Sequence, residues 1–111
     1  MASSEEFVEY AADQLRDAGN ISWRKMFGEY GWYCDGKFMG VICQDQLFIK
    51  ITPQTRKAFP ELPKEPPYDG AKEYFLIEDI EDRELLEKVA RATWEALPEP
   101  KRKRGRKQNG I

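Results

Sequence analysis

The stretch that decides the fold is Ile21–Ile51, ISWRKMFGEYGWYCDGKFMGVICQDQLFIKI. It is rich in aromatic and β-branched residues that alternate with a period of two, the pattern of half-buried strands. Gly28, Asp35-Gly36 and Gln44-Asp45 interrupt it. The Asp-Gly pair tolerates the positive φ that both central positions of a type I′ hairpin turn require. We therefore predict four antiparallel strands joined by tight turns, at 21–26, 29–34, 38–43 and 46–51.

The alternation also predicts which side chains share a face of the sheet. In the third strand, two groups of side chains are expected on opposite faces: Phe38, Gly40 and Ile42 against Met39, Val41 and Cys43. Because both groups contain apolar residues, at least one helix should cover the sheet. Core packing is the interpretation we favour for the aromatic residues, with a protein interface or base stacking as alternatives. These residues are Trp23, Tyr30, Trp32, Tyr33 and Phe38.

Helical patterns flank this stretch on its N-terminal side. Ser3 and Glu6 have the spacing of a capping box, and apolar residues follow at helical intervals until Gly19. We predict a helix over 4–18.

The C-terminal half alternates between helix and loop signals. Thr52-Pro53 is typical of an N-cap followed by proline at the first helical position, which predicts a short helix to about Phe59. The proline-rich segment 60–67 should lack regular structure, and 73–77 resumes strand character. A last helix is expected from Asp79 or Asp82 to Leu97. The fold class is thus α+β: a single domain with an antiparallel sheet of about five strands and three helices.

Length and composition exclude several classes of protein. A chain of 111 residues holds one hydrophobic core. No apolar run could cross a bilayer, and the acidic N-terminus does not resemble a signal peptide, so we expect a cytoplasmic protein. Histidine is absent, which removes the usual nucleophile activation and imidazole metal ligands. We predict a non-enzymatic protein with no catalytic residue, cofactor or metal.

Charge is distributed unevenly along the chain. Residues 98–111 carry six basic side chains and one acidic one, whereas residues 1–97 carry 12 basic and 19 acidic side chains. The body should therefore repel the polyanions that the tail attracts. We predict a domain over 1–97 and a disordered basic tail over 98–111.

The tail resembles an AT-hook, in which an Arg-Gly-Arg core lies along the minor groove of A·T-rich DNA. Its candidate nucleic-acid-binding residues are Lys101, Arg102, Lys103, Arg104, Gly105, Arg106 and Lys107. Lys107 stands where the hook pattern has proline, so the stiff exit is lost. Non-specific binding to nucleic acid and a merely solvated tail are the alternatives.

Three charged residues beside a glycine turn form a candidate site for a partner. They are Arg24, Lys25 and Glu29, which could equally make cross-strand ion pairs. The glycines of the hairpins are read as turns and close contacts, because none opens a helix as a phosphate loop does. Cys34 and Cys43 should be free and buried, since the hairpin separates them by about 20 Å, against about 7 Å for the Cα atoms of a disulfide.

The motifs RKMFGEYG at 24–31, DGK at 35–37 and LFIK at 47–50, with Tyr33, Gly40 and Asp45, resemble the N-terminal domain of the TfoX (Sxy) family. That family contains bacterial regulators of natural competence, thought to act at promoters with the cyclic-AMP receptor protein. The resemblance covers the first helix to about Leu97. It implies an α+β fold similar to secretion chaperones and no catalytic residue. This chain is expected to be a stand-alone domain without the family's second, helical domain.

The function expected from these observations is macromolecule binding. The folded body would contact a protein partner or a second copy of itself, while the tail holds nucleic acid nearby and so raises its local concentration. The alternative is a protein-only adaptor or chaperone-like homodimer with no nucleic-acid role.

Overall fold

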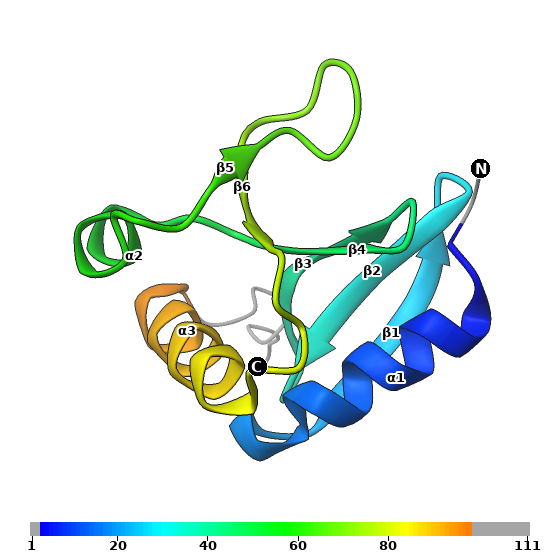
Figure 1. Ribbon diagram of the computed structural model, residues 1–111, viewed down its shortest axis with the longest axis horizontal. Helices are drawn as coiled ribbons and strands as arrows, with labels where there is room; N and C mark the ends of the chain where they lie inside the picture. The colour runs from blue at the N-terminus through cyan, green and yellow to red at the C-terminus, as the bar shows by residue number, and fades with distance from the viewer. Residues whose placement is uncertain (1–2, 99–111) are drawn as a thin grey trace, which may run out of the picture.

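A six-stranded antiparallel sheet with helices on one face organises the computed structural model, which describes residues 3–98 (Figure 1). In chain order the elements are α1 (Glu5–Leu15), the 3₁₀ turn η1 (Arg16–Ala18), β1 (Ile21–Met26), β2 (Glu29–Cys34), β3 (Lys37–Cys43), β4 (Gln46–Ile49), α2 (Pro53–Ala58), β5 (Lys64–Glu65), β6 (Tyr74–Ile77) and α3 (Arg83–Ala96). The strands lie in the order β1-β2-β3-β4-β6-β5. The predicted α+β class is confirmed. Apart from Pro98, the expected basic tail over 98–111, with its hook residues 101–107, lies outside the described residues.

Three tight turns join β1 to β4, as predicted. Both central residues of each turn have positive φ: 52° and 80° at Phe27-Gly28, 48° and 86° at Asp35-Gly36, and 53° and 57° at Gln44-Asp45. This is the geometry of type I′ turns, whose twist matches that of the strands. The register follows, with Cys34 opposite Lys37 and Cys43 opposite Gln46.

One extra residue in β3 makes the predicted alternation wrong at two positions. Trp32 pairs with Gly40 and Tyr33 pairs with Phe38, which leaves Met39 as a β-bulge. Phe38 therefore leaves the face of Gly40 and Ile42 and lies beside Tyr33 on the opposite face. Met39 turns inward instead and is fully buried in the core.

The prediction that segment 60–67 lacks regular structure is wrong at two residues. Lys64 and Glu65 pair with Phe75 and Tyr74, so the sheet has six strands instead of about five. These are the two residues between Pro63 and Pro66 that keep a backbone N–H. A two-residue strand at the sheet edge is the position where neighbouring prolines are tolerated.

The helices α1 and α3 cover one face of the sheet, here called the inner face (Figure 1). Ser4 caps α1 by accepting a hydrogen bond from the backbone N–H of Phe7 at 3.1 Å, so the predicted cap at Ser3 is wrong by one residue. Thr52 and Asp82 cap α2 and α3, as expected. None of the helices within residues 3–98 is long and apolar enough to span a membrane.

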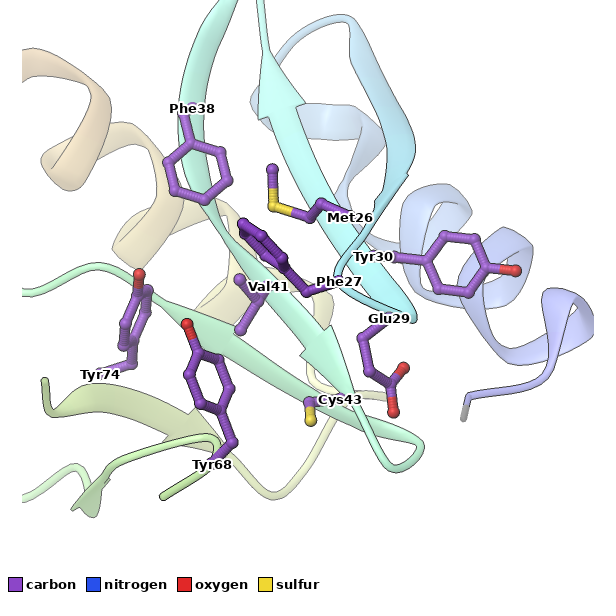
Figure 2. A pocket seen from close by; sticks show the side chains of 9 residues that line it. All are labelled: Met26, Phe27, Glu29, Tyr30, Phe38, Val41, Cys43, Tyr68 and Tyr74. Carbon is purple, nitrogen blue, oxygen red and sulfur yellow. The ribbon is translucent and has the colours of Figure 1, made fainter. Parts of the chain in front are cut away.

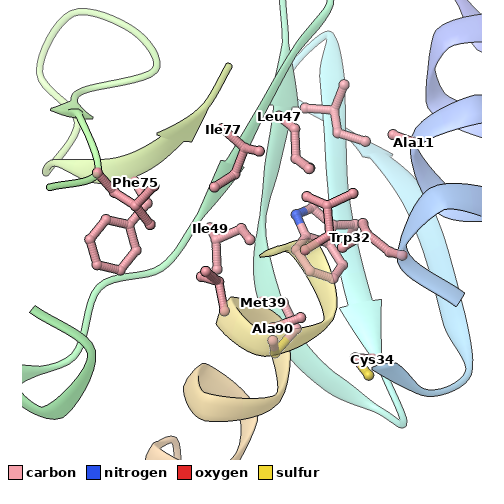
Figure 3. Packing of buried hydrophobic residues seen from close by; sticks show 14 of the residues in the cluster. Ala11, Trp32, Cys34, Met39, Leu47, Ile49, Phe75, Ile77 and Ala90 are labelled. Carbon is pink, nitrogen blue, oxygen red and sulfur yellow. The ribbon is translucent and has the colours of Figure 1, made fainter. Parts of the chain in front are cut away.

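The core lies between these helices and the inner face (Figure 3). Trp32 is its largest fully buried side chain, and the indole N–H donates to the carbonyl of Phe48 at 3.0 Å. This contact crosses Gly40, where an added methyl group would overlap the Phe48 carbonyl oxygen and lie 2.9 Å from the indole nitrogen. Glycine at position 40 is therefore required by close packing.

Candidate functional site on the open face of the sheet

The face of the sheet opposite α1 and α3, here called the open face, carries a second apolar cluster. Its buried members are Val41, Cys43, Phe48 and Leu76, with Phe38 and Tyr74 packed against them. A concavity of about 730 Å³, here called the large hollow, lies over part of this cluster (Figure 2). Its lining residues are Met26, Phe27, Glu29, Tyr30, Phe38, Val41, Cys43, Tyr68 and Tyr74. The ring of Tyr30 turns away toward α1, so the other aromatic rings dominate the hollow.

Exposed aromatic side chains border the large hollow. Phe27 in the β1–β2 turn is 95% exposed and Tyr68 is 56% exposed, and they are two of the three large hydrophobic residues described as exposed. An aromatic ring left in water beside an apolar concavity is typical of a binding surface. The sequence places Phe27 between two predicted strands, within the RKMFGEYG motif, and carries no signal that singles out Tyr68 or Tyr74 as site residues.

A row of cations and aromatic rings lies on the same face. The Arg24 guanidinium lies 5.7 Å from the centroid of the Tyr33 ring, and the Lys50 ammonium lies 5.1 Å from that of Phe38. The two rings are neighbours, with centroids 5.5 Å apart and planes tilted by 59°. We call these four residues the cation–aromatic row. Each cation is held by the negative face of an aromatic ring.

The row borders a smaller concavity of about 250 Å³, the small hollow. Tyr33, Phe38 and Lys50 line it together with Gly36, Lys37, Leu97 and Pro98. The buried Lys37 ammonium donates hydrogen bonds to the carbonyls of Trp94 at 2.8 Å and Leu97 at 2.9 Å. A cation bonded to the last carbonyls of a helix satisfies groups that the helix itself cannot. Lys37 thus fixes the end of α3, and with it the chain at Pro98, beside the row.

The predicted partner site of Arg24, Lys25 and Glu29 is divided by the sheet. Arg24 lies over Tyr33 on the open face, whereas its neighbour Lys25 lies 5.9 Å from the centroid of the Tyr30 ring on the other side of the strand. None of the three ion pairs found within residues 3–98 includes any of these residues. The alternative of cross-strand ion pairs is therefore not what the structure shows, and a single cluster of the three is not formed.

Glu29 has a structural role in this geometry. One carboxylate oxygen accepts from the backbone N–H of Ser3 and the other from that of Gln44, both at 2.9 Å. Burial alone would raise the pKa of Glu29, but these donors outweigh it and hold the pKa below its ordinary value. Glu29 thus connects the start of α1 to the β3–β4 turn. A hydrogen bond from the Asp45 N–H to the Ser3 hydroxyl reinforces this connection.

The five aromatic residues considered for stacking separate into two groups. Trp32 and Tyr30 are buried in the core, and Trp23 packs against it, as core packing predicts. Tyr33 and Phe38 are half-buried on the open face. Of the five, these last two present their rings on the open face, whereas Trp23 is half-buried against the core.

Neither cysteine is poised for chemistry. Both are free and buried, as predicted. Burial, helped by the charge of Asp35, raises the pKa of the Cys34 thiol to about 11, and burial also raises that of Cys43. A protonated thiol is a poor nucleophile. Among residues 3–98, no three histidine, cysteine or acidic side chains lie where they could hold a metal ion.

Comparison with known proteins assigns the chain to a family. The model of the TfoX N-terminal domain matches residues 13–97. The chain belongs to the TfoX N-terminal domain family. The resemblance of the RKMFGEYG and DGK motifs is thereby confirmed, and the TfoX N-terminal match includes the whole cation–aromatic row and the large hollow.

A small relative aligns with most of this chain. The chain is 32% identical over 102 residues to an uncharacterised 12.7 kDa protein in the trpE 5′ region of Spirochaeta aurantia. The aligned region covers 91% of this chain and 89% of the relative. The alignment therefore spans nearly the whole of this sequence and of the relative.

Proposed function

We propose that this protein is a non-enzymatic, regulatory binding module that associates with nucleic acid through its basic tail. The observation that carries the proposal is the separation of charge along the chain. Six of the seven charged residues in 98–111 are basic, while residues 1–97 have an excess of seven acidic side chains. Clustered lysine and arginine next to an acidic body favour a polyanionic ligand at the tail. Membership of the TfoX N-terminal family supports a regulatory role.

The proposal predicts a steep dependence on salt. If each of the six tail cations neutralises a phosphate, a plot of log K against log salt should have a slope of roughly −4 for single-stranded and roughly −5 for duplex nucleic acid. The test compares the full-length protein with a variant in which all six basic residues of 101–107 are replaced by glutamine. Equal affinity of the two proteins for duplex DNA would overturn the proposal.

Minor-groove binding is the finer form of this function. It predicts preference for A·T-rich over G·C-rich duplex, because the narrow groove of A-tracts has an enhanced negative potential. The double variant Arg104→Ala and Arg106→Ala should lose that preference. A charge-matched control is Arg56→Ala with Lys57→Ala on the exposed side of α2, which should keep it. Identical binding of the wild type to both duplexes would leave only the non-specific form.

A second candidate function, a protein-only adaptor or chaperone-like homodimer, is favoured by the large hollow. In such a complex, an apolar segment of the other protein chain would occupy the large hollow and cover the rings of Phe27 and Tyr68. Phe27→Ser tests the homodimer case, because Phe27 is 95% exposed and contributes little to the core. Sedimentation should show a dimer for the wild type and a monomer for the variant. A monomeric wild type would remove the homodimer.

A further inference from the structure

The cation–aromatic row lies where the body is least acidic. Residues 5–18 and 78–96, which form the two covering helices and the segment leading into α3, hold twelve acidic and four basic side chains. Between them, residues 19–77 hold seven acidic and eight basic side chains. The helices cover the inner face, so the acidic excess of the body belongs to the side of the molecule away from the row. A polyanion is thus repelled by the helices and not by the open face.

The cations of the row have no carboxylate partner within residues 3–98. Arg24 and Lys50 take part in none of the three ion pairs there. Burial lowers the pKa of Lys50, and the charge of Lys72 lowers it further. Glu29 stands at the opposite end of β2 from Tyr33, and its two oxygens accept from backbone donors. Without a carboxylate partner of their own, these two cations remain available to an external anion.

The bulge at Met39 creates this arrangement. By inserting one residue, it moves Phe38 to the open face beside Tyr33. The freed carbonyl of Met39 accepts a hydrogen bond from the backbone N–H of Lys50 at 2.8 Å, which holds Lys50 next to Phe38. Bulges commonly re-aim side chains at functional sites. Here the bulge exposes an aromatic ring that regular alternation would have buried.

We infer that the Tyr33–Phe38 pair is a stacking platform for the bases of single-stranded nucleic acid. Arg24 and Lys50, on flexible stems, move from the rings to the phosphates on either side. Aromatic side chains between cations on an open sheet face match the chemistry of unpaired bases, which offer a π-face and a charged backbone at once. A paired duplex has its bases stacked inside and cannot use the platform.

The platform rests on the proposed function and extends it, because it adds a second contact for the ligand of the tail. Pro98 lines the small hollow beside Tyr33 and Phe38, and Lys101 follows it by three residues, a reach of at most about 11 Å. One strand can therefore contact the platform and the tail together. Two linked weak contacts bind more tightly than either alone.

The experiment measures binding of a labelled oligothymidylate to the full-length protein by fluorescence anisotropy. Tyr33→Leu and Phe38→Leu should each weaken binding at least about fivefold, the lower limit for loss of one stacked base. The matched control is Tyr10→Leu, an aromatic residue on α1 that is 40% exposed and should bind as the wild type does. Ultraviolet crosslinks to the oligonucleotide should map to the peptides that contain Tyr33 and Phe38.

A charge variant keeps the test valid if an aromatic variant fails to fold. Lys50→Gln changes a half-exposed side chain and should reduce the magnitude of the salt slope by about 0.7, the contribution of one phosphate contact on a single strand. Lys57→Gln on α2 is its control and should leave the slope unchanged.

The outcomes separate the platform from the proposed function. If the folded Tyr33, Phe38 and Lys50 variants bind the oligonucleotide as the wild type does, the platform is overturned. That is also the result expected if the cation–aromatic row contacts a protein and not nucleic acid. If the glutamine-substituted tail variant loses binding in the same experiment, the proposed function stands alone. If the tail variant binds as the wild type does while Tyr33→Leu and Phe38→Leu weaken binding, the platform stands and the tail proposal fails.

Discussion

Replacing Gly40 with alanine should destabilise the fold more than any other single methyl group added to the central strands. The methyl would overlap the carbonyl oxygen of Phe48 and approach the Trp32 indole nitrogen to 2.9 Å and the Cα of Ile49 to 3.0 Å. Two of these three neighbours are backbone atoms, which cannot move away without disturbing the β3–β4 pairing. The third is the donor of the hydrogen bond that anchors the largest core side chain.

The magnitude follows from two costs. Overpacking a well-packed core costs about 1–3 kcal/mol. If the indole shifts, its buried N–H loses the Phe48 carbonyl, and an unsatisfied buried donor costs about 1–3 kcal/mol more. We therefore expect Gly40→Ala to lower the free energy of unfolding by about 2–6 kcal/mol, a large part of the total of about 5–15 kcal/mol of a typical domain.

Gly31→Ala is the matched control, since Gly31 is also a buried glycine in a central strand. The neighbours of its added methyl are the Met26 sulfur and the edge of the Phe38 ring, both at 2.9 Å, which are the far ends of side chains that can shift. We expect a change within about 1 kcal/mol, because alanine also removes the entropic cost of a glycine in a strand. Urea unfolding followed by tryptophan fluorescence and circular dichroism measures both variants. Equal unfolding midpoints for Gly40→Ala and Gly31→Ala would refute the packing argument.

Three further substitutions test other contacts. Glu29→Gln should lower the free energy of unfolding by about 1 kcal/mol at pH 7, because the charge-assisted hydrogen bonds are lost. Since folding lowers the pKa of Glu29, the wild type is the more stable protein above the unfolded pKa of about 4.3, and this difference disappears as the pH falls through the folded pKa. A difference in stability between the two proteins that persists at low pH would contradict this prediction. Lys37→Met should cost about 1.5–3 kcal/mol by leaving the carbonyls of Trp94 and Leu97 without their donor, whereas Lys57→Met on α2 should leave the thermal midpoint unchanged. Thr93→Val should be neutral or stabilising by up to about 1 kcal/mol, since the buried Thr93 hydroxyl has no hydrogen-bond partner within residues 3–98. A clear loss of stability in this variant would show that the hydroxyl is hydrogen-bonded in solution.

Local signals predicted those parts of the fold that depend on local physics. Asp35-Gly36 can form a type I′ turn because its residues tolerate positive φ, whatever the rest of the chain does. Thr52 caps α2 with its own side chain three residues before Thr55, so the cap needs no tertiary contact. The strands on either side of such turns could therefore be placed within a residue or two from their sequence alone.

The bulge could not be predicted in this way. The segment 38–43 is apolar on both faces, so inserting one residue at Met39 leaves the hydrophobic pattern as plausible as before. Only the pairing of Trp32 with Gly40, imposed by the indole that crosses Gly40 to reach Phe48, determines where the extra residue falls. The alternation therefore predicts the wrong face for both Phe38 and Met39. As a result, it does not identify Phe38 as an aromatic ring on the open face.

Net charge along the chain was equally insufficient to locate a binding face. Counted over 1–97 the body is acidic, yet this number mixes α1 and α3, which carry the excess, with a sheet whose open face presents Arg24 and Lys50. Two tertiary contacts then bring this face to the origin of the basic tail: the Lys50 N–H bonded to Met39, and Lys37 bonded to the end of α3. Each joins residues more than ten positions apart, so no local pattern could indicate it. Because avidity depends on distance between linked sites, the same two basic regions would be unrelated if α3 ended elsewhere on the sheet.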